Sequence, residues 1–463
     1  MKIIGPIEVT ENSHPFSSMK FSREIIHLED YNFIEEEYFI EDRANVYDLK
    51  NNQVEIFKED LPFTTRILVR RPKNSKDFTG ILYVDIMNAS NGYDIEDLWR
   101  RSYLHIMENN HAYVGITTKP INVLALKNFD YERYKSLNWS NGEIVNAPAT
   151  IDPLTASIEG TEEGLVWDIL LKTGLALKRG DLPQIKADYI YLTGQSQSGI
   201  YLNTFVNYMH NYYKKNNLEI PFDGYLSLAS GGLGRALRQI KDSKVPMSIK
   251  ECREEEIDRP VITFNAEGDY KLFESMGSEF KKTRNENTDK NKRRYYEMAG
   301  APHTNAASPL VPKNEEIVKT KCPARLLDSD YDYRLNDLPF DFYINSILDF
   351  LHDWAKNGNE PPIIEPLKRE KGKFVKDKYG NTLGGIRSPF LEVPKAKYLA
   401  NAEDNLTNGI MEFFPEEKIK EIYGSFENYI EQFEKYALNQ VKEKMLTKND
   451  AERAIDWAKN IKK

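Results

Sequence analysis

Apolar and polar residues follow one another along the chain in blocks of two kinds, one of strand length and one with helical spacing. Short, almost continuous apolar runs occur at residues 80–86, 112–117, 189–192, 224–228 and 261–264. Runs of this kind are typical of parallel strands that are buried on both faces of a sheet. Because helical segments separate them, the pattern predicts an α/β fold with a mostly parallel central sheet flanked by helices.

The predicted helices are recognised by apolar residues that recur three and four positions apart. The first begins near Asp94, and others cover residues 163–173, 200–212 and 342–356. Asp94 and Asp97 resemble a capping box, so we expect them to start the first helix.

The N-terminal part and the middle of the chain depart from this regular alternation. Residues 1–60 contain strand-like runs, notably residues 33–40, which polar turns separate, and residues 63–69 predict another strand. Residues 118–160 are irregular and rich in Asn, Pro and aromatic residues. We expect this segment to form an excursion over the ends of the strands.

A change in composition near residue 360 indicates a domain boundary. The stretch Gly-Asn-Glu-Pro-Pro lies at residues 358–362, where it breaks helical periodicity. We therefore expect a main domain over residues 1–360 and an extension over residues 361–463. Residues 426–441 of the extension have one apolar helical face, which predicts a helical appendage docked on the main domain.

The clearest candidate for chemistry is the turn that follows the strand at residues 189–192. Its sequence is Gly194-Gln195-Ser196-Gln197-Ser198-Gly199, and an amphipathic helix follows. A serine on a sharp turn between strand and helix, flanked by small residues, is typical of a nucleophile elbow. Ser198 replaces the second glycine of the usual G-x-S-x-G pattern. The alternative interpretation is an ordinary turn rich in serine and glycine.

A nucleophilic serine needs a base to take its proton, and the base needs a carboxylate to orient it. Of the seven histidines, only His303 lies in a loop of small residues just beyond a late strand. The strand at residues 261–264 leads to two carboxylates, of which Asp269 is the predicted acid and Glu267 the alternative. Either could instead cap the following helix. The order Ser196, Asp269, His303 is that of the α/β-hydrolase triad.

An oxyanion hole would require two backbone N–H donors near the serine. In nucleophile elbows one donor belongs to the residue after the serine, which is Gln197 here. The second belongs to the loop after the strand at residues 80–86, where we expect Asn88, with Ala89 as the alternative.

Composition and charge exclude several other classes of protein. The 463 residues are 40% hydrophobic and 29% charged, which is usual for a folded globular chain. A formal net charge of −9 argues against a protein that binds nucleic acid. The two cysteines, Cys252 and Cys322, are too few for a disulfide scaffold or a zinc site. Nothing in the sequence implies a metal or organic cofactor, and the oligomeric state stays open.

The sequence also bears on where the protein would be found. No run of residues is long and apolar enough to span a membrane, and the N-terminus shows no signal-peptide pattern. We therefore expect a soluble, cytoplasmic protein, unless a signal peptide has been trimmed from the chain.

Several segments together carry a resemblance to a known family. The most specific is the motif YGNxLGGIRxP within residues 377–389, and the others are Asn88 with residues 91–94, and residues 164–170, 194–199 and 298–303. With these segments the chain resembles, over nearly its whole length, the bacterial and fungal α/β-hydrolase-domain proteins that have a long C-terminal extension. The resemblance implies the α/β-hydrolase fold and puts Ser196 and His303 in the catalytic positions.

The motif in the extension contains an arginine on a stiff turn. Gly384 and Gly385 allow close backbone approach, and Pro389 fixes the exit from the turn. A guanidinium held in this way can clamp a carboxylate bidentately. We expect Arg387 to pin the extension near the rim of the active site. The alternative is that Arg387 binds an acidic substrate.

These features predict a serine hydrolase that cleaves a small carboxylic ester through an acyl-enzyme intermediate. An amidase, thioesterase or acyltransferase could use the same three residues. A binding protein that has the α/β-hydrolase fold but no turnover is an alternative from another class. The complete set of Ser196, Asp269 and His303 argues against that last alternative, because a binding protein has no need of all three. Fold alone does not decide function.

Overall fold

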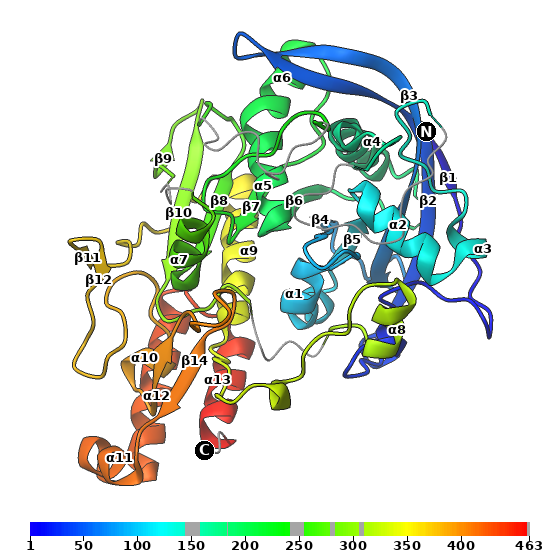
Figure 1. Cartoon of the computed structure of the whole chain (residues 1–463). Coiled ribbons are helices and arrows are strands. Elements are labelled where there is room, and N and C mark those ends of the chain that lie inside the picture. The colour runs from blue at the N-terminus through cyan, green and yellow to red at the C-terminus, as the bar shows by residue number, and fades with distance from the viewer. Residues whose placement is uncertain (144–157, 183, 241–253, 278–282, 305–309, 461–463) are drawn as a thin grey trace. The chain divides into compact units, whose positions relative to one another are not determined.

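The computed structural model describes residues 1–143, 158–182, 184–240, 254–277, 283–304 and 310–460 (Figure 1). The chain forms two compact units, and each is described by itself. The first comprises Met1–Pro260, Thr288–Lys292 and Pro309–Arg325, and the second comprises Val261–Asn287, Arg293–Ser308 and Leu326–Lys463. The predicted extension, residues 361–463, is part of the second unit, and the domain boundary near residue 360 stays a prediction.

The first unit is built around strands that are buried along their whole length. Every residue of β4, β5 and β7 is buried, which explains why these strands appear in the sequence as continuous apolar runs. Strands β5, β4, β6 and β7 run parallel, whereas β3 pairs antiparallel with β5. In spatial order the strands of this unit are β1 (Lys2–Ile4), β2 (Phe33–Lys50), β3 (Gln53–Pro72), β5 (Ala112–Ile116), β4 (Ile81–Ile86), β6 (Tyr189–Gln195) and β7 (Gly224–Leu228).

The order of these strands places the loops that follow β4 and β6 at the same edge of the sheet. The chain passes from β4 to β5 on one side and then returns to β6 on the other side of β4. At such a reversal the loops after the two neighbouring strands diverge, and ligands of open α/β sheets bind in the resulting crevice. The loop after β4 and the turn after β6 therefore share this edge.

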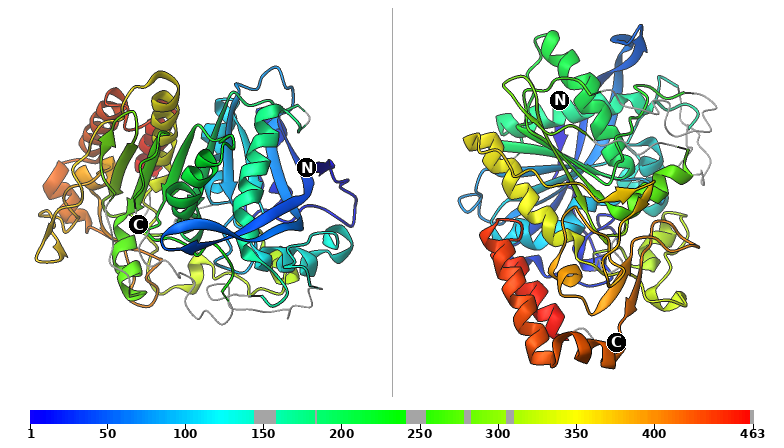
Figure 2. Two further views of the ribbon diagram at one scale, coloured as in Figure 1. Left: turned by 90° about the horizontal axis from the view of Figure 1, so that it is seen from above. Right: turned by 90° about the vertical axis from the view of Figure 1, so that its left-hand side faces the viewer.

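Strands β2 and β3 form a long, twisted hairpin (Figure 2). Its two-residue turn consists of Asn51 and Asn52, both with positive φ, as a type I′ turn requires. The expectation of short runs separated by polar turns was wrong here, because β2 continues unbroken to Lys50. The polar residues beyond Ile40 fit within the strand because they have partners outside it. Arg43 pairs with Asp60 of β3 at 2.7 Å, the Asn45 N–H donates to Asp168 at 2.7 Å, and Asp48 pairs with Arg238 at 2.5 Å.

Helices of the first unit pack against both the central strands and the hairpin. Helix α1 packs on β4, β5 and β6, α4 packs on β2 and β6, and α5 packs on β4, β6 and β7. The predicted excursion is partly helical, since α2 and α3 lie within it, and its residues 144–157 lie outside the described residues. The helices are α1 (Asp97–Glu108), α2 (Pro120–Phe129), α3 (Tyr131–Tyr134), α4 (Val166–Arg179), α5 (Gln197–Thr204), α6 (His210–Lys215) and α8 (Asn314–Lys319).

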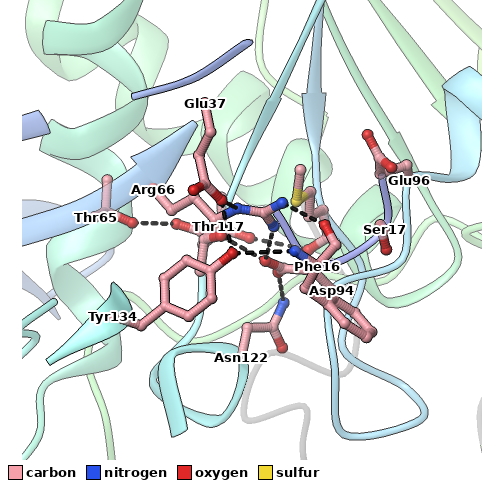
Figure 3. Close-up of polar contacts among 12 residues, drawn as sticks. Phe16, Ser17, Glu37, Thr65, Arg66, Asp94, Glu96, Thr117, Asn122 and Tyr134 are labelled. Atoms are coloured by element: carbon pink, nitrogen blue, oxygen red, sulfur yellow. Dashed lines mark hydrogen bonds and ion pairs between the residues drawn. The ribbon is translucent and has the colours of Figure 1, made fainter. Parts of the chain in front are cut away.

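The predicted capping box at the start of the first helix is wrong. Helix α1 begins at Asp97 rather than near Asp94, and the side chain of its N-cap residue, Glu96, makes no capping hydrogen bond. Asp94 instead joins a buried polar cluster, in which it binds Arg66 at 3.1 Å, the Thr117 hydroxyl at 2.5 Å and the Asn122 amide (Figure 3). This cluster fixes the end of the loop that follows β4.

The second unit has two parallel strands, β8 and β10, in register from Val261 to Ala266. It also contains two small antiparallel strand pairs and a set of C-terminal helices. No helix in the described part of the chain is both long and apolar enough to cross a membrane. The elements are β8 (Val261–Ala266), α7 (Glu267–Ser275), β9 (Glu286–Asn287), β10 (Lys292–Met298), α9 (Phe340–Asn357), β11 (Arg369–Glu370), β12 (Lys373–Phe374), α10 (Pro389–Glu392), β13 (Ala396–Leu399), β14 (Ile410–Phe413), α11 (Glu416–Tyr423), α12 (Phe426–Lys442) and α13 (Lys448–Asn460).

A buried carboxyl group on β4 makes the stability of the fold depend on pH. Asp85 accepts hydrogen bonds from the Leu98 N–H and the Tyr113 hydroxyl, both at 3.1 Å. Burial, and next the charge of Asp97, raise the pKa of Asp85 to about 8. Between roughly pH 4 and 8 the folded chain keeps this proton while the unfolded chain has lost it. The free energy of unfolding therefore falls as pH rises, by at most about 1.4 kcal/mol per pH unit for this group.

We predict that Asp85→Asn removes this contribution and makes the free energy of unfolding less dependent on pH between these limits. Urea denaturation at about pH 5, 6, 7 and 8 would measure how steeply the free energy of unfolding changes with pH. The variant Asp77→Asn, at an exposed position, is the matched control and should keep the slope of the wild type. An unchanged slope in Asp85→Asn would contradict the prediction.

Candidate active site

Ser196 lies on the sharp turn between β6 and α5, as the sequence predicted. Its backbone has φ 55° and ψ −121°, an unusual conformation for a residue with a side chain. Such backbones cost about 1–3 kcal/mol and persist where the surroundings enforce them, often at functional sites. Ser196 is half-buried, and its N–H donates to the Leu228 carbonyl at 2.9 Å.

The small residues around Ser196 are required because α5 closely approaches both β6 and the end of β7. A Cβ atom at Gly194 would collide with the Ser198 backbone, and one at Gly199 would lie 2.7 Å from Ser230 Cβ. Ser198 is fully buried, in the position where the usual pattern has a glycine. The local sequence thus explains why this turn can form.

The loop after β4 brings the two candidate oxyanion donors near the elbow. The Asn88 N–H donates to the Ile95 carbonyl at 2.9 Å, and the Asn88 amide donates to the Gln195 carbonyl at 3.0 Å. The Ala89 N–H donates instead to Gln197 Oε1 at 3.0 Å. This geometry favours Ala89 over Asn88 as the donor of this loop, because the Asn88 N–H already has a backbone acceptor.

Lys119 is a residue beside the elbow that sequence reasoning missed. It follows β5 at the same edge of the sheet and is 2% exposed. Its ammonium donates to the Met87 carbonyl at 2.6 Å, to Thr118 Oγ1 at 3.0 Å and to Ser198 Oγ at 3.1 Å. Burial lowers the pKa of Lys119 to about 7. Its place just after an apolar strand is the only signal in the sequence, and lysines there are usually exposed.

Asp269 and His303 lie together in the second unit. Asp269 is in the first turn of α7, and His303 is in the loop after β10. His303 Nδ1 lies 2.6 Å from Asp269 Oδ1, and both side chains are at least 95% buried. Asp269 Oδ2 also accepts the Ala266 N–H at 2.7 Å, so this carboxylate caps the helix and binds the histidine. Neutral His303 therefore carries its proton on Nδ1, which leaves Nε2 as the basic nitrogen.

Glu267, the alternative acid, has different partners. Its carboxylate accepts the Gly300 N–H at 2.7 Å and the Thr382 hydroxyl at 2.7 Å, and it pairs with Lys376 at 2.9 Å. The structure therefore brings Asp269, and not Glu267, to the Nδ1 atom of His303. Ser196, Asn88 and Gln197 belong to the first unit, whereas Asp269 and His303 belong to the second.

Arg387 binds acceptors of its own segment. Its guanidinium pairs with Asp377 at 2.8 Å, donates to the Leu391 carbonyl at 3.2 Å and also binds the Thr382 carbonyl and Glu392. The side chain is 11% exposed. These four acceptors all lie within residues 377–392, so Arg387 stabilises the turn that contains the YGNxLGGIRxP motif. The pinning of the extension near the rim of the active site, and the binding of an acidic substrate, stay predictions.

Comparison with known proteins places the chain in a family. The model of the alpha/beta hydrolase domain matches residues 3–456, and no curated protein matches the sequence. Among solved structures, the chain is similar to a fungal esterase from Rhizomucor miehei, at 11% identity and a TM-score of 0.34, over 71% of this chain and 85% of that one. It is also similar to a glucuronoyl esterase of carbohydrate esterase family 15 from Caldicellulosiruptor kristjansonii, at 13% identity and a TM-score of 0.30, over 70% and 80% of the two chains.

Structural similarity at such low identity and TM-score does not support any conclusion about the chemistry of this chain. The family match, in contrast, covers nearly the whole sequence, and the mostly parallel sheet with flanking helices agrees with it. The predicted fold class and the resemblance noted in the sequence are therefore confirmed. The chain belongs to the alpha/beta hydrolase domain family.

Proposed function

We propose that the protein is a serine hydrolase that cleaves carboxylic esters through an acyl-enzyme intermediate. The observation that carries this proposal is the backbone of Ser196, a non-glycine residue held at positive φ between β6 and α5. A nucleophile elbow requires this conformation, because it exposes the serine hydroxyl at the end of the strand. The ψ of −121° at Ser196 also lies outside the left-handed region, which is where residues with side chains and positive φ are ordinarily found in turns.

In the proposed mechanism His303 acts as the base and Asp269 orients it. Nε2 of His303 takes the proton of Ser196 Oγ as the oxygen attacks the carbonyl carbon of the ester. The carboxylate of Asp269 holds the proton on Nδ1 and stabilises the imidazolium that forms. The contact at 2.6 Å between Asp269 and His303 supports these two roles. His303 then gives its proton to the leaving alcohol, and the acyl group stays on Ser196.

The second half of the reaction removes the acyl group. Water attacks the acyl carbon while His303 takes its proton, the bond to Ser196 Oγ then breaks as His303 gives that proton to the oxygen, and a carboxylic acid leaves. In both halves negative charge develops on the carbonyl oxygen. We assign its stabilisation to the N–H groups of Gln197 and Ala89. Since the Ala89 N–H donates to Gln197 Oε1 in this structure, the Gln197 side chain must turn away when the ester binds.

The role of the nucleophile is tested by exchanging its hydroxyl. We predict that Ser196→Ala reduces hydrolysis of p-nitrophenyl esters to near background and leaves the free energy of unfolding within about 1 kcal/mol of the wild type. The matched control is Ser198→Ala, which removes a hydroxyl two residues away and should still react with a fluorophosphonate probe. If Ser198→Ala abolishes labelling and Ser196→Ala does not, the elbow has been assigned to the wrong serine.

The two carboxylates of α7 should differ in their effect on turnover. We predict that Asp269→Asn lowers kcat by as much as about 10⁴-fold, because an amide would favour the wrong tautomer of His303. Glu267→Gln should be less damaging, since Glu267 does not contact Nδ1 of His303. Steady-state kinetics with one ester would compare them. A larger loss in Glu267→Gln than in Asp269→Asn would assign the orienting role to Glu267.

A further inference from the structure

The carboxylate of Glu267 is buried, yet the proposed mechanism gives it no step. Glu267 is the first residue of α7 and is 4% exposed. Two of its partners, Lys376 and Thr382, lie more than a hundred residues away in the sequence, in the extension. The third is the backbone N–H of Gly300. Glu267 therefore joins the segment around the YGNxLGGIRxP motif to the loop that carries His303.

The first turn of α7 binds the His303 loop at three consecutive positions. The Glu267 carboxylate accepts the Gly300 N–H at 2.7 Å, the Gly268 N–H donates to the Ala301 carbonyl at 3.0 Å, and the Asp269 carboxylate binds His303 at 2.6 Å. Residues two apart on a helix point to opposite sides, because each residue turns by about 100°. Asp269 can thus face His303 while Glu267 faces the extension.

The partners of Glu267 in the extension are themselves held firmly. Thr382 is fully buried, and its hydroxyl lies 2.5 Å from Lys376 Nζ and 2.7 Å from Glu267. The Arg387 guanidinium binds the Thr382 carbonyl and, at 2.8 Å, the Asp377 carboxylate. A stiff turn therefore presents the Thr382 hydroxyl to Glu267.

The same segment also binds the strand that leads to the His303 loop. The Ile386 N–H donates to the Glu297 carbonyl at 2.7 Å, and the Ala299 N–H donates to the Ile386 carbonyl at 3.0 Å. A Cβ atom at Gly385 would lie 2.7 Å from the Glu297 carbonyl oxygen, so only glycine fits this approach. The segment thus binds β10 just before the loop and, through Glu267, the start of the loop.

We propose that residues 376–387 are a positioning element that acts through Glu267 and aligns His303 with Asp269. This proposal rests on the function proposed above. Glu267, Thr382 and Lys376 are positioning residues in it and touch no reacting atom. Without the Thr382 hydroxyl, Glu267 loses one of three donors, and the turn of α7 and the Gly300 backbone are less firmly held. Displacement of a reacting group by about 1 Å can lower a rate by about 10²-fold.

The test compares two substitutions of Thr382. Thr382→Val has nearly the same shape but no hydroxyl, and we expect kcat to fall by about 10- to 10²-fold with KM unchanged. Thr382→Ser keeps the hydroxyl and should retain kcat within about twofold, on the same reasoning. Titration of active sites with a fluorophosphonate gives the concentration of competent protein, so that a smaller folded fraction is not taken for slower turnover.

A second pair of variants keeps the test decisive if Thr382→Val does not fold. Lys376→Met removes the ammonium that binds Glu267, and Lys373→Met removes an exposed ammonium of β12, outside the positioning element. We expect kcat to fall in Lys376→Met and to stay at the wild-type value in Lys373→Met.

The outcomes separate this proposal from the one on which it rests. An active wild type, with Thr382→Val and Lys376→Met at the wild-type kcat and only a lower melting temperature, would overturn the positioning role and leave the proposed function intact. A wild type that neither hydrolyses esters nor reacts with the fluorophosphonate would overturn the proposed function, and the positioning role with it.

Discussion

The close approach of β6 and α5 at Ser196 is the constraint on which the candidate site depends. It requires a small side chain at residue 194, and the serine between strand and helix has positive φ. Gly199 in turn lets α5 approach the end of β7. The turn lies beside β4, at the edge where the order of the parallel strands reverses and their loops diverge. The buried sheet thus provides a rigid support for a strained residue, which is the usual condition under which such backbones persist.

Each unit contains buried charged side chains, and fixed hydrogen-bond partners offset the cost of burying them. Around the loop after β4, Arg66 and Asn122 bind Asp94, and Lys119 joins the Met87 carbonyl to the elbow. In the second unit Glu267 receives donors from two segments that are distant in sequence. Charged groups are costly to bury unless they are paired and hydrogen-bonded. Each cluster therefore fixes the geometry of the loops that contribute to it.

Features with a local cause could be predicted from the sequence, whereas those made by distant partners could not. The elbow follows from small residues on both sides of Ser196, and the buried strands follow from continuous apolar runs. The unbroken course of β2 was missed because the partners of its polar residues beyond Ile40, among them Asp60 and Asp168, lie outside the strand. Asp94 was taken for a helix cap because its partner Arg66 lies on β3, distant in the sequence. Two of the three partners of Glu267 named above, Lys376 and Thr382, lie in the extension, and local pattern gives no sign of such contacts.

The central claim, that Ser196 is the nucleophile, is tested most directly by locating the adduct of a fluorophosphonate. The wild-type protein would be treated with the probe, digested, and mapped by tandem mass spectrometry. We predict a single phosphonylated residue, Ser196. The neighbouring hydroxyl of Ser198 serves as an internal control on the same peptide, because it is fully buried. An adduct on any other residue, or no adduct in a folded protein, would contradict the claim.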